Sequence, residues 1–419
     1  MRVLVVGGGG REHALCWGLD RSPSVTAILA APGNPGIAAL KKARCLPIAV
    51  DRIDALVAAT DDVDLVVVGP EAPLVAGLAD ALRARGRLVF GCSAAAAALE
   101  GSKAFSKAFM HRHRIPTAAF GVFDAIAPAE AFIASLGART VVKADGLAAG
   151  KGVFLCDSVA EAKTAVATLL DGGLGAAGRR VVIEEFLVGR EASLLALVHD
   201  EQVLVLPPAE DHKTVFDGDL GPMTGGMGTV SPTPVLGPAE VERALQDVLI
   251  PTARGMCSDG KPFQGVIFAG LMWTATGPKV LEYNCRFGDP ETQVIVPRLE
   301  DDLGELLRAA AAGQLPSTLA VSAEAAVCVV MTAAGYPGAY AGGVAIRGLE
   351  AVSDAIVFQA GTKLVDGELV TAGGRVLGVT ALGADVDAAR ALAYAAVREI
   401  SFDGAHFRSD VGARGRLPR

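Results

Sequence analysis

Short apolar runs alternate with amphipathic segments along the first hundred residues. The runs at residues 3–6, 65–68 and 88–90 are typical of buried strands, and residues 11–19 and 74–85 are typical of helices. Strands that alternate with helices predict an α/β fold built on a parallel sheet. The loops at the carboxyl ends of such a sheet form a crevice in which ligands bind.

A different pattern predicts a hairpin between residues 264 and 299. Residues 266–273 are apolar and favour a strand, residues 276–278 are a turn signal, and residues 280–284 resume a short strand. We expect this hairpin to carry the chemistry of the chain, because charged side chains are dense along and after its second strand.

Side chains alternate between the two faces of a strand. Glu282 and Asn284 therefore share one face, while Leu281 and Tyr283 point to the other. A carboxylate and an amide oxygen two residues apart suit a hard cation such as Mg²⁺ or Mn²⁺. The alternative is a hairpin whose polar face lies in solvent.

Charged residues continue after the hairpin in the sequence RFGDPETQ. The planar guanidinium of Arg286 can bind phosphate or carboxylate. Asp289 followed by Pro290 predicts a helix N-cap with proline at the first helical position, so Glu291 and Gln293 fall in the first turn. The density of polar groups favours a functional cluster over an ordinary helix cap.

Glycine-rich loops occur at two places that could hold phosphates. Residues 7–10 connect a strand to a helix, and residues 145–152, DGLAAGKG, connect predicted strands at 140–143 and 153–156. The first loop fails the dinucleotide-binding spacing in both registers, and the second is no Walker A loop, because GxxxxGK[ST] is absent. A long loop between two strands suits a mobile lid.

The predicted helix at residues 102–112 places Lys103 and Lys107 on one face. Such a pair is usually a solvated basic face. His111 and His113 lack a nearby third ligand candidate and are interpreted as surface histidines. Residues 209–228 predict a long irregular loop, which in a compact domain is usually functional.

Composition excludes several classes of protein. The net charge of −8 and the scattered lysines and arginines argue against a nucleic-acid surface. Seven separate cysteines without a CxxC pair fit free thiols in the cytoplasm. The mean hydropathy is +0.42, yet no apolar run approaches the roughly 20 residues of a membrane-spanning helix. We expect a cytoplasmic protein that binds neither membrane nor nucleic acid.

The motifs together resemble one family. LEYNC followed by RFGDPETQ resembles the signature of the phosphoribosylamine–glycine ligases, which belong to the ATP-grasp carboxylate–amine ligases. The resemblance covers essentially the whole chain. Further matching motifs are GGGGREHAL, GPEAPLVAGLAD, VVKADGLAAGKGV, VIEEFLVGREAS, AGTK, GGRVLGVTALG and FDGAHFRSDVG.

The resemblance implies three domains and a reaction. The domains are an amino-terminal α/β domain at residues 1–101, an ATP-grasp domain at 102–324 with a lid at about 117–188, and a small carboxyl-terminal α+β domain at 325–419. Glycine would be phosphorylated by ATP, and the glycyl phosphate would react with 5-phosphoribosylamine to give glycinamide ribonucleotide, a step of purine biosynthesis. We expect a monomer.

The resemblance also implies a role for individual residues. Glu282 and Asn284 would bind the metal. Those that would bind ATP are Lys103, Lys143, Gly150, Lys151, Gly152, Glu184, Glu185, Phe186, Leu187 and Glu191. The implied catalytic residues are Arg286, Asp289 and Lys213. Substrates would contact Gly8, Gly9, Gly10, Glu71, Asp211, His212, Asp217, Arg286, Lys363 and Arg375.

Two departures and three rival functions remain. Met223 stands where the family usually has Asn, and residues 269–272 offer no third acid for the metal, so water and phosphate oxygens must complete its shell. The rivals are another ATP-grasp enzyme of purine or biotin metabolism, a nicotinamide oxidoreductase, and a non-catalytic nucleotide sensor. RFGDPETQ disfavours the first rival, and the failed glycine spacing disfavours the second. The retained Glu282 and Asn284 disfavour the third.

Overall fold

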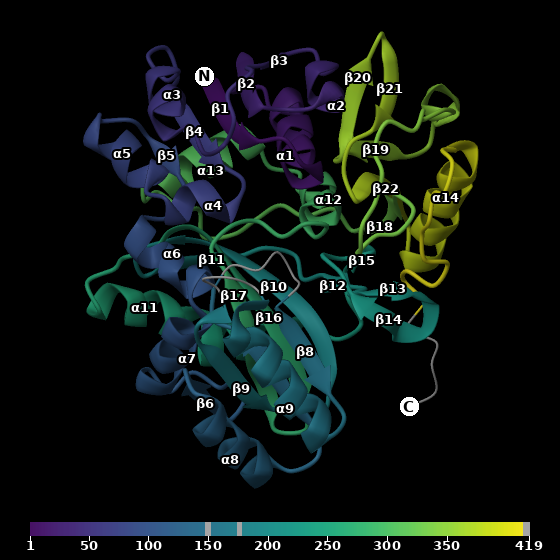
Figure 1. Ribbon diagram of the computed structural model, residues 1–419. Helices are drawn as coiled ribbons and strands as arrows, with labels where there is room; N and C mark the ends of the chain where they lie inside the picture. The colour runs from purple at the N-terminus through teal and green to yellow at the C-terminus, as the bar shows by residue number, and fades with distance from the viewer. Residues whose placement is uncertain (147–151, 174–177, 414–419) are drawn as a thin grey trace.

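The first unit of the fold is a five-stranded parallel sheet, as the alternating pattern predicts. The computed structural model describes residues 1–146, 152–173 and 178–413 (Figure 1). The strand order is β3-β2-β1-β4-β5, and every pair is parallel. The strands are β1 (Arg2–Gly7), β2 (Ala27–Pro32), β3 (Ala43–Cys45), β4 (Leu65–Val68) and β5 (Val89–Phe90).

Helices surround this sheet and lead into the next unit. The helix predicted at residues 74–85 is instead divided in two, because Gly77 adopts a φ of +86° between the halves. Ser102 caps the helix that carries Lys103, and its side chain accepts from the backbone of Phe105. The helices are α1 (Gly10–Arg21), α2 (Pro35–Ala38), α3 (Ile53–Ala58), α4 (Glu71–Val75), α5 (Leu78–Ala84), α6 (Ala94–Gly101) and α7 (Lys103–Arg112).

A four-stranded antiparallel sheet of order β6-β9-β7-β8 follows, at the bottom of Figure 1. Its apolar side chains form a core of their own with two helices, in which Val142, Ile183 and Val166 are fully buried. Ser158 caps the second of these helices, and its side chain accepts a hydrogen bond from the backbone of Glu161. The elements are β6 (Phe120–Phe123), α8 (Ile126–Leu136), β7 (Thr140–Ala144), β8 (Val153–Cys156), α9 (Val159–Thr168), η1 (Leu169–Gly173) and β9 (Val181–Glu185).

The predicted hairpin lies in a second antiparallel sheet, of order β11-β10-β16-β17. Helical segments pack around it, and its apolar side chains join the core of the amino-terminal unit. The strands are β10 (Arg190–His199), β11 (Gln202–Val205), β16 (Gln264–Thr274) and β17 (Gly277–Asn284). The helical segments are α10 (Pro238–Ala244), η4 (Leu245–Leu249), α11 (Ile250–Ser258), α12 (Thr292–Ile295), η5 (Val296–Arg298) and α13 (Leu303–Ala311).

The last sheet has the order β12-β15-β18-β22-β19 and takes strands from both sides of residue 325. Residues 209–228, predicted as an irregular loop, instead contain three short strands and the first residue of a fourth, β15, which pairs with a strand about a hundred residues later. The strands are β12 (Glu210–Asp211), β13 (Thr214–Phe216), β14 (Leu220–Met223), β15 (Gly228–Ser231), β18 (Ala325–Thr332), β19 (Ile356–Gln359) and β22 (Arg375–Gly383).

The remaining elements lie on the outside of this sheet (Figure 1). A short hairpin of β20 (Thr362–Val365) and β21 (Glu368–Thr371) projects beside it, and α14 (Val386–Glu399) packs along β18 and β22. Single turns occur at η3 (Asp217–Asp219) and η6 (Leu349–Ala351).

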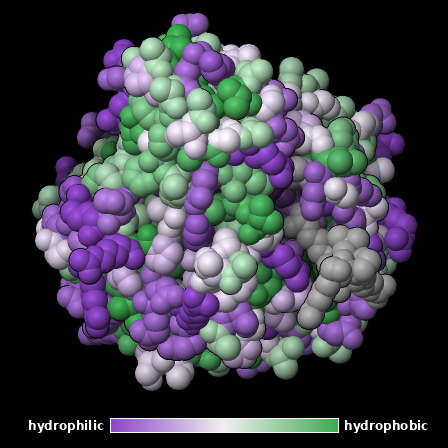
Figure 2. Space-filling model, turned by 90° about the horizontal axis from the view of Figure 1, so that it is seen from below, coloured by the Kyte–Doolittle hydropathy of each residue, from purple (hydrophilic) through white to green (hydrophobic). Residues whose placement is uncertain are grey.

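The surface carries polar and apolar residues side by side. Figure 2 views the molecule from the side on which α8 lies in Figure 1, and the two kinds of residue are interspersed there. Among the described residues, no helix combines the length and the apolar character that crossing a bilayer requires.

Candidate active site

A cleft of about 910 Å³ lies where the parts of the chain meet. Arg11 and Glu71 line it from the amino-terminal unit, Arg375 lines it from the last sheet, and Tyr336 lines it from the loop after β18. The predicted site residues that line it are Glu71, Lys103, Lys143, Gly152, Glu184, Glu185, Phe186, Leu187, Glu191, Asp211, Lys213, Glu282, Asn284, Arg286, Asp289 and Arg375.

Lysines line one end of the cleft. Lys143 is the residue before the last of β7, and its Nζ lies 2.8 Å from Glu184 Oε1 and donates to the carbonyl of Leu281 at 3.1 Å. Burial lowers the pKa of Lys103, while the nearby Glu282 carboxylate opposes that shift. The interpretation of Lys107 as part of a solvated face is wrong, because this side chain is buried against Glu184.

The proposed metal ligands lie on the cleft face of β17. Glu282 pairs across the hairpin with Gly270, and Asn284 pairs with Phe268. Tyr283 is buried on the opposite face, as the alternation predicts. Leu281 also lines the cleft, contrary to the prediction, because a bulge between Gly270 and Leu271 leaves it without a partner and breaks the alternation.

Arg286 is held by carboxylates rather than left free. Its Nε donates to Glu71 at 3.1 Å, and its Nη2 donates to Glu100 at 2.8 Å and to Asn284 Oδ1 at 3.0 Å. Burial raises the pKa of Glu100. Burial acts the same way on Glu71, but the charges of Arg286 and Arg11 outweigh it and lower its pKa. The guanidinium of Arg286, predicted to bind phosphate or carboxylate, is thus already paired with two acids of the chain itself.

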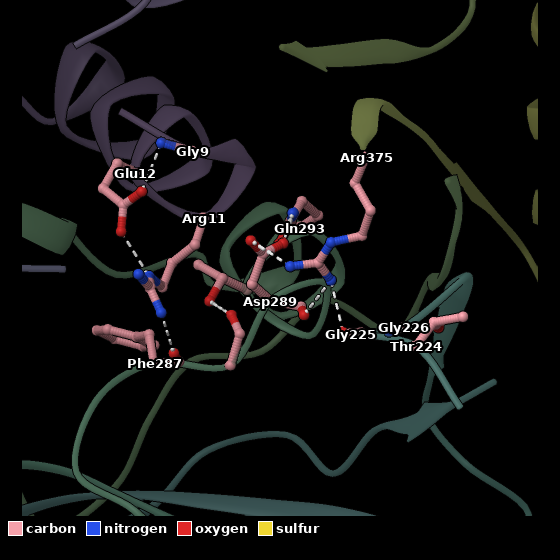
Figure 3. A network of polar contacts seen from close by, with 12 residues as sticks. Gly9, Arg11, Glu12, Thr224, Gly225, Gly226, Phe287, Asp289, Gln293 and Arg375 are labelled. Atoms are coloured by element: carbon pink, nitrogen blue, oxygen red, sulfur yellow. Dashed lines mark hydrogen bonds and ion pairs between the residues drawn. The ribbon is translucent and has the colours of Figure 1, made fainter. Parts of the chain in front are cut away.

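Asp289 joins the hairpin segment to the last sheet (Figure 3). Arg375 Nη2 donates to its carboxylate at 3.0 Å, Arg375 Nη1 donates to the carbonyl of Gly225 at 2.5 Å, and Gln293 Nε2 donates to Asp289 Oδ1 at 2.7 Å. The prediction of Asp289 as a helix N-cap is wrong: α12 begins at Thr292, since the carboxylate binds side chains rather than helix amides.

A half-buried lysine lies among acids in the same cleft. Lys213 Nζ is 2.8 Å from Asp211 Oδ2 and 4.0 Å from Glu291 Oε1, and Ser193 Oγ donates to Glu291 at 2.9 Å. Burial alone would lower the pKa of Lys213, but the charges of Asp211 and Glu291 raise it well above its ordinary value. Lys213 therefore remains a fixed cation.

The glycine loop predicted to hold an anion contains the chain's own carboxylate. Glu12 accepts a hydrogen bond from the backbone of Gly9 at 2.7 Å and from Arg11 Nε at 2.5 Å. A Cβ on Gly7 or on Gly69 would collide with the Glu12 side chain. Gly8, Gly9 and Gly10 do not line the cleft, although Arg11 beside them does.

Three other predicted contacts lie away from the cleft. His212 is fully buried, and its Nδ1 lies 3.2 Å from the carbonyl of Gly228. Asp217 accepts from the backbone of Ser409 at 2.8 Å. Lys363 is exposed on β20. Gly150 and Lys151 lie outside the described residues.

Sequence reasoning missed several residues of the cleft. Lys107 was discounted as a surface lysine. Glu100 precedes a helix boundary and has no local signal, because its partner Arg286 is 186 residues away. Arg11, which donates to the carbonyl of Phe287 at 3.2 Å, could have been found from its place beside the glycine loop.

The oxygen donors in the cleft suit a hard cation that takes further oxygen ligands from elsewhere. Glu282 and Asn284 offer a carboxylate and an amide oxygen on one face of β17, beside Lys103 and Lys143. Within the described ranges, no group of three His, Cys, Asp or Glu residues is arranged to hold a metal alone. A metal here would take its remaining ligands from water or phosphate.

Comparison with known proteins agrees with this architecture. Three family models match: phosphoribosylglycinamide synthetase N domain at residues 1–100, ATP-grasp (A) domain at 101–292 and C domain at 326–414. The phosphoribosylamine–glycine ligase of Allochromatium vinosum is 52% identical over 421 residues, covering 99% of this chain and 98% of that protein.

Solved structures extend the comparison. The crystal structure of phosphoribosylamine–glycine ligase from Thermotoga maritima has a TM-score of 0.86 and 33% identity, and the match covers 98% of this chain and 100% of that one. The biotin carboxylase domain of Hydrogenobacter thermophilus 2-oxoglutarate carboxylase has a TM-score of 0.73 and 16% identity, covering 97% and 91%, which shows a shared fold alone. By its whole-length match and its three domains, the chain belongs to the phosphoribosylglycinamide synthetase family.

Proposed function

We propose that this chain is an ATP-dependent ligase that joins the carboxylate of glycine to the amine of 5-phosphoribosylamine, a step of purine biosynthesis. The observation that carries the proposal is one cleft with three features: lysines that can bind phosphate, a carboxylate and an amide that can bind a metal, and a second charged cluster that includes a residue of the last sheet. The relatives that match over the whole chain are named for this reaction.

ATP would lie between the two antiparallel sheets. Lys103 and Lys143 would contact its phosphates, and Glu191 its ribose, while the backbone of residues 184–187 would face adenine. A cation–π contact holds Phe186 in place: the guanidinium of Arg139 lies 3.8 Å from the centre of the Phe186 ring.

Glu282 and Asn284 would hold Mg²⁺ or Mn²⁺. A divalent cation at this place supplies charge neutralisation to the transferring phosphate. Asn284 Oδ1 already accepts a hydrogen bond from Arg286, and this hydrogen bond fixes the orientation of the side-chain amide. Residues 269–272 offer no third acid, and Gly270 lies opposite Glu282.

The second charged cluster would hold the acceptor substrates. Lys213, fixed as a cation by Asp211 and Glu291, would neutralise charge on the glycine carboxylate as it is phosphorylated. Arg375 and Asp289 lie where the last sheet meets the hairpin segment, and we assign them to 5-phosphoribosylamine. The glycine loop would act through Glu12 and Arg11 rather than as an open phosphate cradle.

The reaction balances in two steps. A carboxylate oxygen of glycine attacks the γ-phosphorus of ATP, ADP leaves, and glycyl phosphate forms. The neutral amine of phosphoribosylamine then attacks the carbonyl carbon, the C–O bond to phosphate breaks, and the nitrogen loses a proton. The residues mainly align the reactants and balance charge.

The compartment, the oligomeric state and the partners are proposed from composition and chemistry. We propose that the enzyme works in the cytoplasm as a monomer on small molecules, without nucleic acid or membrane. The free cysteines support a reducing compartment. Gel filtration with light scattering tests the assembly, and a dimer would contradict it.

The test of the function is release of ADP with each substrate alone and with both. We expect release to need glycine and phosphoribosylamine together. Alanine should be a poor but detectable substrate, because rejecting one methyl group by shape is worth only about 1–3 kcal/mol. If bicarbonate, formate or aspartate replaces glycine with equal efficiency, the chain is another ATP-grasp enzyme.

A further inference from the structure

Two buried lysines share one carboxylate at the nucleotide end of the cleft. Lys107 Nζ lies 2.8 Å from Glu184 Oε2, and Lys143 Nζ lies 2.8 Å from Glu184 Oε1. The exposed fractions are 2% for Lys107, 2% for Glu184 and 6% for Lys143. The lysines come from α7 and β7, and the carboxylate comes from β9.

Lys107 is fixed in this place by a second contact. Its Nζ donates to Thr117 Oγ1 at 2.7 Å, and that hydroxyl donates its own hydrogen to the carbonyl of Val280 at 2.6 Å. The ammonium of Lys107 therefore cannot follow a phosphate group without breaking two hydrogen bonds. Lys143 is held by Glu184 and by the carbonyl of Leu281.

The charges of this trio determine what Lys143 can do. A single lysine beside a buried carboxylate forms a closed ion pair with little charge left for a third partner. With two lysines on one carboxylate, the trio carries a net positive charge. Burial lowers the pKa of Lys107 to about 8, and Glu184 opposes the shift, so Lys107 is mostly protonated at neutral pH.

We propose that Lys107 is a positioning residue for ATP: it balances the charge of Glu184, so that Lys143 remains available to the phosphates instead of being locked in an ion pair. The proposal rests on the proposed function only in taking ATP as the ligand. Neither the family resemblance nor the local sequence gives Lys107 a role, because its partner Glu184 is 77 residues away.

The first experiment measures steady-state kinetics of Lys107→Met, which keeps the length of the side chain and removes its charge. We expect the KM for ATP to rise at least about tenfold, while the KM for glycine and the kcat at saturating ATP change by less than about threefold. Lys163→Met is the matched control, since Lys163 also pairs with a carboxylate but outside the cleft. It should leave all three constants unchanged.

The second experiment distinguishes charge balance from a structural role. Because Lys107 acts through Glu184, the double variant Lys107→Met/Glu184→Gln should have the same KM for ATP as Glu184→Gln alone, within about threefold. A structural role predicts a further loss when both partners are removed. This comparison also holds if Lys107→Met alone does not fold.

The outcomes separate this proposal from the proposed function. A wild-type KM for ATP in Lys107→Met, or a tenfold gap between Glu184→Gln and the double variant, overturns the role of Lys107. The wild-type enzyme would still release ADP with glycine and phosphoribosylamine. Conversely, if the wild type does not need those substrates, nucleotide affinity measured by calorimetry with ATP still tests Lys107.

Discussion

Charge pairing decides what each residue of the cleft can do. Arg286 lies between Glu71 and Glu100, and Lys213 lies between Asp211 and Glu291. Removing one member would leave a buried charge without compensation, which costs more than the pair contributes. These side chains therefore act as charges fixed in place rather than as mobile groups that close on a ligand.

The metal site gives the first residue-scale prediction. Glu282→Ala should abolish activity at ordinary Mg²⁺ and leave the fold intact, because Tyr283 and Val280 keep the core face of β17. Asn284→Ala should instead raise the metal concentration needed for half-maximal rate. Metal titrations of ADP release, with circular dichroism for the fold, measure both effects.

An exposed carboxylate provides the control for this pair. Glu242→Ala removes an exposed acid from α10 and should keep the wild-type metal dependence. Full activity of Glu282→Ala without added metal would show that the face of β17 does not bind the cation.

The types of residue in the cleft could be predicted from sequence, but their pairing could not. Glu282, Asn284 and the lysines Lys103 and Lys143 were found from local pattern or resemblance. Glu100 and Lys107 were not, because the groups that define them lie 186 and 77 residues away. Local spacing holds no information about such partners.

Secondary-structure elements were predictable where their signal was local. The hairpin of β16 and β17 follows from alternation and a turn signal, whereas its bulge at Leu281 does not, because the bulge depends on register with the partner strand. The strands β12 and β15 were missed for a similar reason, since β12 pairs with β15 and β15 pairs with the distant β18. β13 and β14 form a short irregular hairpin of their own.

The contact between α1 and β19 provides a prediction on pH. His13 is 5% exposed, and its Nδ1 accepts a hydrogen bond from the backbone of Gln359 at 2.8 Å. Burial lowers the pKa of His13 from 6.5 to about 4. The unfolded chain therefore takes up a proton as pH falls below about 6.5, while the folded chain resists until about pH 4.

The stability that neutral His13 contributes is thus present above its unfolded pKa and is lost as pH falls through this window. We expect the free energy of unfolding to drop by about 2 kcal/mol from this group between pH 7 and pH 5. His13→Asn, measured by urea unfolding at both values, should show a smaller drop, and the exposed His111→Asn should behave as wild type. An unchanged drop in His13→Asn would contradict this account.

The whole molecule brings distant parts of the chain to one cleft. Arg11 and Glu71 come from helices α1 and α4 beside the parallel sheet, Lys143 and Glu282 from the antiparallel sheets, and Arg375 from the last sheet. The sequence predicts these units, because each has its own local pattern. Their convergence depends on packing between units, and for this the family resemblance was the only guide.

The central claim is that the enzyme activates the carboxylate of glycine by phosphorylation. The most direct test uses glycine labelled with ¹⁸O in both carboxylate oxygens, together with ATP and phosphoribosylamine, and mass spectrometry of the phosphate released. Glycyl phosphate loses its bridging oxygen with the phosphate, so each phosphate should carry one ¹⁸O from glycine. Unlabelled phosphate formed together with the amide product would contradict this account.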